Sequence, residues 1–188
     1  MAVNGACRLL RRGMPLHAWF GVGLIVATAG ADEAPGLQHQ PVPCTVPRER
    51  SLLCATITDD LGVASARLYF RPAGERYFSW VAMTFDGLRF CGALPAPREN
   101  KAKALEYYMY AVDETYQSAR TSTYRMQVEP ESLCEFPPIA RATEPGASLV
   151  VHATHKKQGR KLHDAFDSGG VSFVVFAAAA DPVTHRRQ

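Results

Sequence analysis

The stretch "EYYMYAVDETY", residues 106–116, decides the fold of this chain. Aromatic and β-branched residues crowd its first part and a turn-type cluster follows, which predicts a β-strand. Alternate side chains of a strand point to opposite faces. Tyr107 and Met109 therefore share one face, while Tyr108 and Tyr110 share the other. Both faces are apolar, so if one fills a core, the other needs a partner, a cover or a role at the surface.

Similar segments recur at short, regular intervals from about Cys44 onward, which is typical of an all-β sandwich. The expected strands cover residues 43–46, 51–58, 63–71, 77–85, 88–94, 104–112 and 120–128. Turn residues separate these strands, and Asp86-Gly87 gives the strongest hairpin signal because Asp-Gly favours a tight two-residue turn. We expect no helix within this region.

Residues 54–128 resemble the bacterial secreted immunoglobulin-like or fibronectin type III-like modules. The resemblance lies in "ATITDDLGVASARLYFRP", "MTFDGLRFCGALPAP" and "LEYYMYAVDETY". Such modules pair a "TDD-small-G-V" turn into the third strand with an aromatic strand that ends in A-x-D. The resemblance implies an antiparallel sandwich of about seven strands, and its turn and core motifs imply no particular activity.

The segments outside the sandwich are expected to differ from it. Residues 1–31 contain three arginines before an apolar run that ends in small residues, which is the layout of a secretory signal. The alternative is an uncleaved membrane anchor. We expect the sandwich over residues 42–130, a Pro-rich linker over 131–147, a small β-hairpin region with a basic loop over 148–178, and a disordered tail over 179–188.

The charge of the chain is balanced once the N-terminal segment is set aside. The full sequence has 21 Lys and Arg and 18 Asp and Glu. Residues 1–31 contain three of the arginines and no acid, which leaves 18 residues of each sign. A nucleic-acid-binding domain usually has a basic face, so we expect no specific nucleic-acid partner.

Four cysteines remain after residue 31, and an even number in an exported chain indicates two disulfides with three possible connectivities. The sequence has no C-x-x-C pair of the kind that zinc sites use. In the sandwich that the resemblance implies, Cys54 and Cys91 are turned outward at similar height on neighbouring strands, and Cys44 and Cys134 lie at one end. We therefore predict the disulfides Cys54–Cys91 and Cys44–Cys134.

The second apolar face of residues 104–112 is the main candidate for a functional surface. In such a sandwich this strand lies in the C-F-G sheet, whose outer face is expected to carry Arg67, Tyr69, Arg71, Tyr108 and Tyr110. Arg and Tyr are enriched where proteins bind partners, and a tyrosine platform beside arginines suits a sugar ring. Two alternatives remain open: an ordinary sheet surface stabilised by cross-strand tyrosines, or a face covered by residues 135–188.

Carboxylates from several loops form a weak candidate for a calcium site, because Ca²⁺ takes six to eight oxygen ligands. They are Asp59, Asp60, Asp86, Asp113 and Glu114. Aspartate in a turn more often hydrogen-bonds its own backbone, and no EF-hand register is present. We therefore expect no bound metal.

A second candidate is an anion patch in the basic loop between two apolar segments, residues 149–153 and 171–176, which are expected to pair. The patch comprises Lys156, Lys157, Arg160 and Lys161. Metal binding by His152, His155 and His163 is one alternative, and a solvated loop is the other.

The sequence contains no G-x-S-x-G, no H-E-x-x-H and no phosphate-binding loop, so we expect neither catalysis nor a cofactor. We expect a secreted, periplasmic or envelope-associated module that binds a protein, a glycan or the cell envelope through the outer C-F-G face, or acts as a spacer. The alternative is an accessory subunit that positions an exported hydrolase or adhesion partner.

Overall fold

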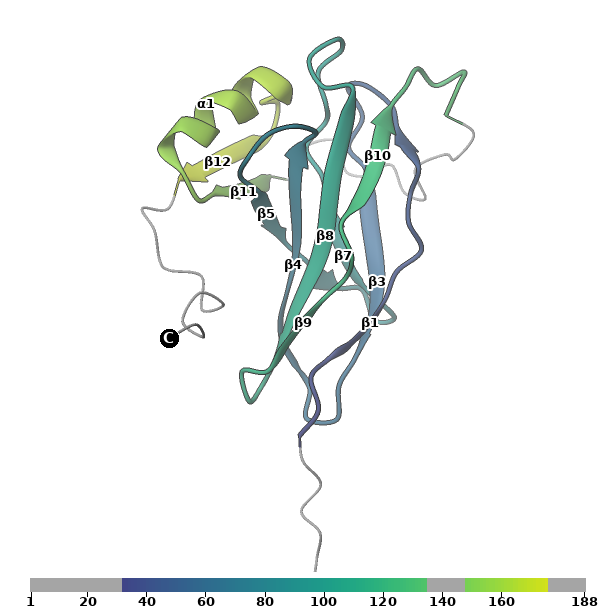
Figure 1. Ribbon diagram of the computed structural model, residues 1–188, viewed down its shortest axis with the longest axis vertical. Coiled ribbons are helices and arrows are strands. Elements are labelled where there is room, and N and C mark those ends of the chain that lie inside the picture. Colours follow the sequence, from purple (N-terminus) through teal and green to yellow (C-terminus); the bar gives the residue numbers. More distant parts are fainter. Residues whose placement is uncertain (1–31, 135–147, 176–188) are drawn as a thin grey trace, which may run out of the picture. The chain divides into compact units, whose positions relative to one another are not determined.

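The computed structural model describes residues 32–134 and 148–175, in which two β-sheets pack face to face (Figure 1). The all-β sandwich expected from the sequence is confirmed. The expected signal segment, most of the expected linker and the expected tail lie outside the described residues. Within the described ranges, no helix is both long enough and apolar enough to cross a membrane.

The smaller sheet has four antiparallel strands in the order β1-β3-β7-β6. Their bounds are β1 (Gly36–Gln38), β3 (Leu52–Thr58), β7 (Phe90–Ala93) and β6 (Thr84–Phe85). The sequence pattern does not predict β1, because a strand of three residues is too short to show an alternating pattern. In the structure β1 is held by its pairing with β3, where Leu37 lies opposite Ile57.

The larger sheet has eight strands in the order β12-β11-β5-β4-β8-β10-β2, with β9 also paired to β8. The strands that the expected sandwich supplies are β2 (Cys44–Thr45), β4 (Val63–Pro72), β5 (Ser79–Ala82), β8 (Ala104–Asp113), β9 (Ser118–Arg120) and β10 (Tyr124–Val128). The long strands β4 and β8 are antiparallel neighbours at its centre, and β10 lies beside β8 (Figure 1).

The expected strand over residues 77–85 is divided between the two sheets. Its first half, β5, pairs with β4, whereas its second half, β6, pairs with β7. Met83 lies at the crossing point, and its backbone N–H still donates to the carbonyl oxygen of Ala66 at 2.9 Å. Phe85 continues the alternation of residues 79, 81 and 83 past the crossing, although it is 60% exposed in β6, so the sequence could not reveal the break.

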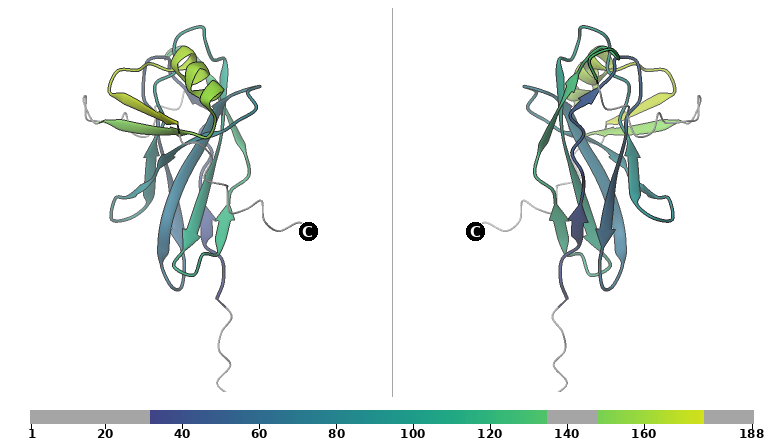
Figure 2. Two further views of the ribbon diagram at one scale, coloured as in Figure 1. Left: turned by 90° about the vertical axis from the view of Figure 1, so that its left-hand side faces the viewer. Right: turned by 90° about the vertical axis from the view of Figure 1, so that its right-hand side faces the viewer.

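The C-terminal region differs from the expected hairpin and basic loop. It forms β11 (Leu149–Ala153), α1 (Lys156–Ala165) and β12 (Val171–Val175), and β12 runs parallel to β11 (Figures 1 and 2). The physical reason lies in the helical spacing of Gln158, Leu162, Ala165 and Phe166, all of which are buried. A helix between the two strands returns the chain to the same end of the sheet, as a parallel pair requires.

Residues 148–175 belong to the same core as the sandwich rather than to a separate region. The strand β11 pairs antiparallel with β5, which places His152 opposite Trp80. Val151, Leu162 and Phe166 lie in one apolar cluster with the inner residues of β4 and β8. The helix α1 therefore packs on the inner side of the larger sheet.

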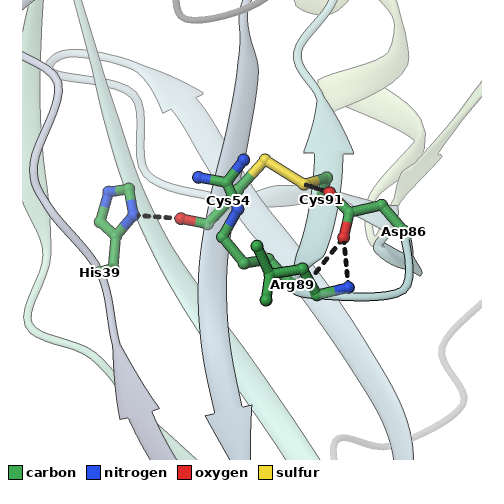
Figure 3. The surroundings of a disulfide bond; sticks show 6 residues. His39, Cys54, Asp86, Arg89 and Cys91 are labelled. Carbon is green, nitrogen blue, oxygen red and sulfur yellow. Dashed lines mark hydrogen bonds between the residues drawn. A yellow bond between two sulfur atoms is a disulfide. The ribbon is translucent and has the colours of Figure 1, made fainter.

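Both predicted disulfides are present, Cys44–Cys134 and Cys54–Cys91. Cys54 and Cys91 lie directly opposite each other on β3 and β7. Figure 3 shows this bond with His39 on one side, Asp86 on the other and the Arg89 side chain beside Cys54. Sγ of Cys91 lies 3.4 Å from Oδ2 of Asp86, a contact without a hydrogen bond because a disulfide sulfur carries no proton.

A half-buried histidine connects β1 to the core. Nδ1 of His39 lies 2.8 Å from the carbonyl oxygen of Cys54, and Nε2 lies 3.0 Å from the hydroxyl of Tyr107. A carbonyl oxygen only accepts, so Nδ1 carries the proton and Nε2 accepts from Tyr107. The Tyr107 hydroxyl in turn accepts from the N–H of Val42 at 3.0 Å. Burial raises the pKa of Tyr107 to about 12, so this hydroxyl keeps its proton at neutral pH.

This network predicts that acid destabilises the protein through His39. Burial lowers the pKa of His39 below its ordinary value, although the hydrogen bond to Cys54 opposes the shift. The unfolded chain then binds the proton more readily than the folded chain. Stability should therefore be fully present above a pH of about 6.5 and should fall as the pH drops from there toward the folded-state pKa.

Urea unfolding from pH 8 to pH 5 measures this effect, and the variant His39→Gln is the control. The pKa of His152 is also lowered, by burial and by the charge of Arg67, so a part of the pH dependence with the same sign should remain in the variant. An unchanged pH dependence in His39→Gln would show that the network does not favour the neutral imidazole.

Candidate binding surface

The outer face of the larger sheet, which is turned away from the smaller sheet, carries three rows of side chains that run across the strands. The middle row, here called the aromatic row, consists of residues that lie directly opposite one another on four neighbouring strands. They are His152 on β11, Trp80 on β5, Tyr69 on β4 and Tyr108 on β8. Neighbouring strands are about 4.8 Å apart, so the aromatic row is about 14 Å long.

The aromatic rings of this row stack face to face in two pairs. The rings of Tyr69 and Tyr108 are 4.7 Å apart at an interplanar angle of 4°. Those of Trp80 and His152 are 3.8 Å apart at 13°. In each pair the two partners use one ring face on each other. Ring edges are the electropositive part of an aromatic side chain, so the row favours acceptor-rich groups.

Arginine side chains from the flanking rows lie on these rings and on Phe78. The guanidinium carbon of Arg67 is 4.5 Å from the Trp80 ring centre, and that of Arg120 is 5.2 Å from the Tyr108 ring centre. Arg71 lies 4.1 Å from the centre of Phe78. Such cation–π contacts hold the guanidinium groups in place. Arg71 also donates from Nε to Glu106 and from Nη1 to the carbonyl oxygen of Arg76.

The flanking rows give the face an excess of positive charge. One row contains Arg71, Glu106 and Arg125, in which Arg71 Nη2 and Glu106 Oε2 are 2.7 Å apart and Arg125 Nη1 and Glu106 Oε1 are 3.5 Å apart. The other row contains Arg67, Tyr110 and Arg120. Within the described ranges, neither Arg67 nor Arg120 makes an ion pair. Four arginines and one carboxylate thus lie on this face.

All five residues predicted for the outer face lie on it, and the structure adds Trp80, Arg120 and His152. Trp80 follows from the alternation of residues 78, 80 and 82 once β5 is known to pair with β4. Arg120 follows from its pairing opposite Tyr110. No signal in the sequence could have placed His152, because the partner of β11 is set by packing rather than by a local pattern.

Three of the five carboxylates considered for calcium, those of Asp59, Asp86 and Asp113, accept hydrogen bonds from backbone N–H groups of their own turns. Oδ1 of Asp59 accepts from the N–H groups of Leu61 and Gly62, and Oδ1 of Asp113 accepts from those of Thr115 and Gln117. The N–H groups of Arg89 and Leu88 donate to Asp86 and lower its pKa. Among residues 32–134 and 148–175, no three His, Cys, Asp or Glu side chains gather closely enough to hold a metal ion.

The basic residues predicted as an anion patch lie on α1 rather than on a loop. The side chains of Lys157, Arg160 and Lys161 are exposed on this helix. The three histidines considered for metal binding each pack against a different aromatic ring. His152 stacks on Trp80, His155 on Tyr77, and His163 lies against Phe173.

No protein-family model matches the chain, and no curated protein matches it in sequence. Among solved structures, an engineered protein is similar with a TM-score of 0.40 and 13% identity, covering 53% of this chain and 21% of its own. The SrpA adhesin from Streptococcus sanguinis has a TM-score of 0.36 and 15% identity, covering 53% of this chain and 59% of its own. The chain thus spans less than two thirds of either. These similarities are weak, and the neighbours are all-β.

Proposed function

We propose that this protein is an exported, non-catalytic binding module of the immunoglobulin-like kind, and that the outer face of its larger sheet binds an acidic glycan. The strand order of the smaller sheet supports an immunoglobulin-like module. With β1, β3, β6 and β7 as strands A, B, D and E, the smaller sheet has the order A-B-E-D of immunoglobulin-like sandwiches. Two disulfides agree with an oxidising compartment.

The observation that carries the proposal is the aromatic row between two arginine-containing rows. The ring edges are electropositive, and the guanidinium groups of Arg67 and Arg120 are cationic hydrogen-bond donors. A ligand with regularly spaced carboxylates and hydroxyls matches such a row, which is about 14 Å long. In the exported compartment that the sequence predicts, acidic glycans have this chemistry.

The double variant Arg67→Gln/Arg120→Gln is expected to bind polygalacturonate at least about tenfold more weakly than the unmodified protein. Both cations would be lost while the strands and the aromatic row remain. The control is Arg48→Gln, because the Arg48 side chain is 73% exposed on the loop after β2 and belongs to neither row. Isothermal titration calorimetry measures the affinities, with neutral dextran as the comparison polymer.

Equal binding of dextran and polygalacturonate, or an unchanged affinity in the double variant, would contradict the proposal. Melting temperatures of the variants should stay within a few degrees of the unmodified protein. Co-purification of a hydrolase from culture supernatant, without glycan binding, would instead favour an accessory subunit.

A further inference from the structure

A hollow of about 260 Å³ lies between the loop that joins β4 to β5 and one face of α1. Residues 75–77 of the loop form one side of this hollow, here called the α1 pocket, and the helix forms the other side with Lys157, Gln158, Lys161 and Leu162. Binding sites for drug-sized ligands begin at about 300 Å³. The α1 pocket is therefore large enough for one ring and a charged group, but not for an oligomer.

The α1 pocket is separate from the outer face of the sheet. Gln158 of the pocket donates from Nε2 to Oγ of Ser79 at 2.7 Å. Ser79 and Trp80 are consecutive residues of β5, so their side chains point to opposite faces. Trp80 belongs to the aromatic row on the outer face, and the pocket thus opens on the other side of the sheet.

The wall of the α1 pocket is held in place by a buried glutamine. Nε2 of Gln158 also donates to the carbonyl oxygen of Tyr77 at 3.0 Å, while Oε1 accepts from the N–H and the hydroxyl of Thr154, each at 3.1 Å. These four bonds satisfy the amide and tie α1 to the β4–β5 loop. The ring of Tyr77 is fixed by stacking on His155 at 4.5 Å. A preformed site loses little entropy when a ligand binds.

The charges of the α1 pocket are unbalanced. Lys161 Nζ and Glu75 Oε2 form an ion pair at 2.5 Å. The other two cations, Arg76 and Lys157, make no ion pair within the described part of the chain. A neighbouring hollow of about 210 Å³ shares Glu75 and Lys161 but adds one acid and one base, so its charges balance. The excess positive charge is thus specific to the α1 pocket.

We propose that the α1 pocket binds a small organic anion, a single ring that carries a phosphate or carboxylate group. Tyr77 and Leu162 provide apolar contact for the ring. Arg76 and Lys157 bind the anionic group, and the N-terminal end of α1 adds a favourable potential there. This inference goes beyond the proposed function and does not depend on it, because no residue of the outer rows takes part.

The probe for the test is phenyl phosphate, followed by amide chemical shifts in an NMR titration. Inorganic phosphate lacks the ring and phenol lacks the charge, so each should bind at least about tenfold more weakly than phenyl phosphate. A parallel titration with benzoate ranks carboxylate against phosphate. The amides of Tyr77 and Gln158 should shift most. No shift of these amides at about 10 mM phenyl phosphate would overturn the proposal.

The double variant Arg76→Ala/Lys157→Ala should weaken phenyl phosphate binding at least about tenfold. The matched control is Arg160→Ala, which removes an exposed cation of the same helix that does not line the pocket. It should leave the affinity within about twofold. Equal weakening by both variants would mean that phenyl phosphate is attracted by the general positive charge, and would overturn the proposal that it binds in the α1 pocket. The variant Arg67→Gln/Arg120→Gln should bind phenyl phosphate normally, which separates this site from the glycan face.

Discussion

Removing the Cys44–Cys134 disulfide with the double variant Cys44→Ala/Cys134→Ala is expected to lower the free energy of unfolding by about 4 to 5 kcal/mol. The bond joins residues 90 positions apart, and the loop-closure entropy that it removes from the unfolded chain grows with the length of the loop. The bond also holds β2, the edge strand of the larger sheet. This strand has only two residues and pairs with β10 through Gln127 and Val128.

The comparison variant is Cys54→Ala/Cys91→Ala, whose bond spans 37 positions. Its expected loss, about 4 kcal/mol, is smaller because the closed loop is shorter. Urea unfolding of both double variants measures the difference. Peptide mapping without reduction provides the chemical check, and a peptide that joins Cys44 to Cys54 would contradict the pairing.

The second large effect is expected from Phe166→Ala, which should cost about 3 to 5 kcal/mol. Phe166 follows α1, is fully buried and lies edge-to-face against Phe70 of β4 at 5.5 Å. The backbone around it is also bound to the sandwich, since the N–H of Arg98 donates to the Ala165 oxygen and that of Asp167 donates to the Ala96 oxygen. Truncation would leave a cavity where the two parts of the chain meet.

Because residues 148–175 share one core with the sandwich, the Phe166→Ala variant should still unfold in a single transition. Phe166→Leu keeps more of the apolar volume and should cost less. Leu133→Ala is the surface control, because Leu133 is 66% exposed, and it should change stability by less than about 0.5 kcal/mol. Two separate transitions in Phe166→Ala would show that the C-terminal region folds independently.

The sequence predicted the residues at the centre of the outer face but not those at its ends. The alternation in β4 and β8 placed Arg67, Tyr69, Arg71, Tyr108 and Tyr110 on one face, and their register then fixed which rings meet. The stacking geometry was not predictable, because ring orientation depends on the neighbours on both sides. Only the structure shows that the rings meet in stacked pairs with arginines beside them.

The helix of the C-terminal region could not be predicted from the sequence. Its run of charges predicts a loop, although Leu162, Ala165 and Phe166 repeat at helical spacing in and just after it. A short helix with so many charges is stable only when its apolar side is buried, and the sequence does not show against what. The division of residues 77–85 between two sheets is equally invisible in the sequence, because Phe85 of β6 continues the apolar alternation although it is 60% exposed.

The amino-acid sequence by itself determined the sandwich, the two disulfides and the side-chain direction along β4 and β8. The sandwich and the side-chain directions depend on alternation and on turn residues, which are local. The disulfides depend in addition on the strand order that the resemblance implies. Only the tertiary structure decided that β11 adds to the edge of the sheet beside β5, which brings His152 onto Trp80 and places α1 against the β4–β5 loop. That choice depends on which exposed edge and which uncovered part of the core fit together in space, and local patterns carry no information about either.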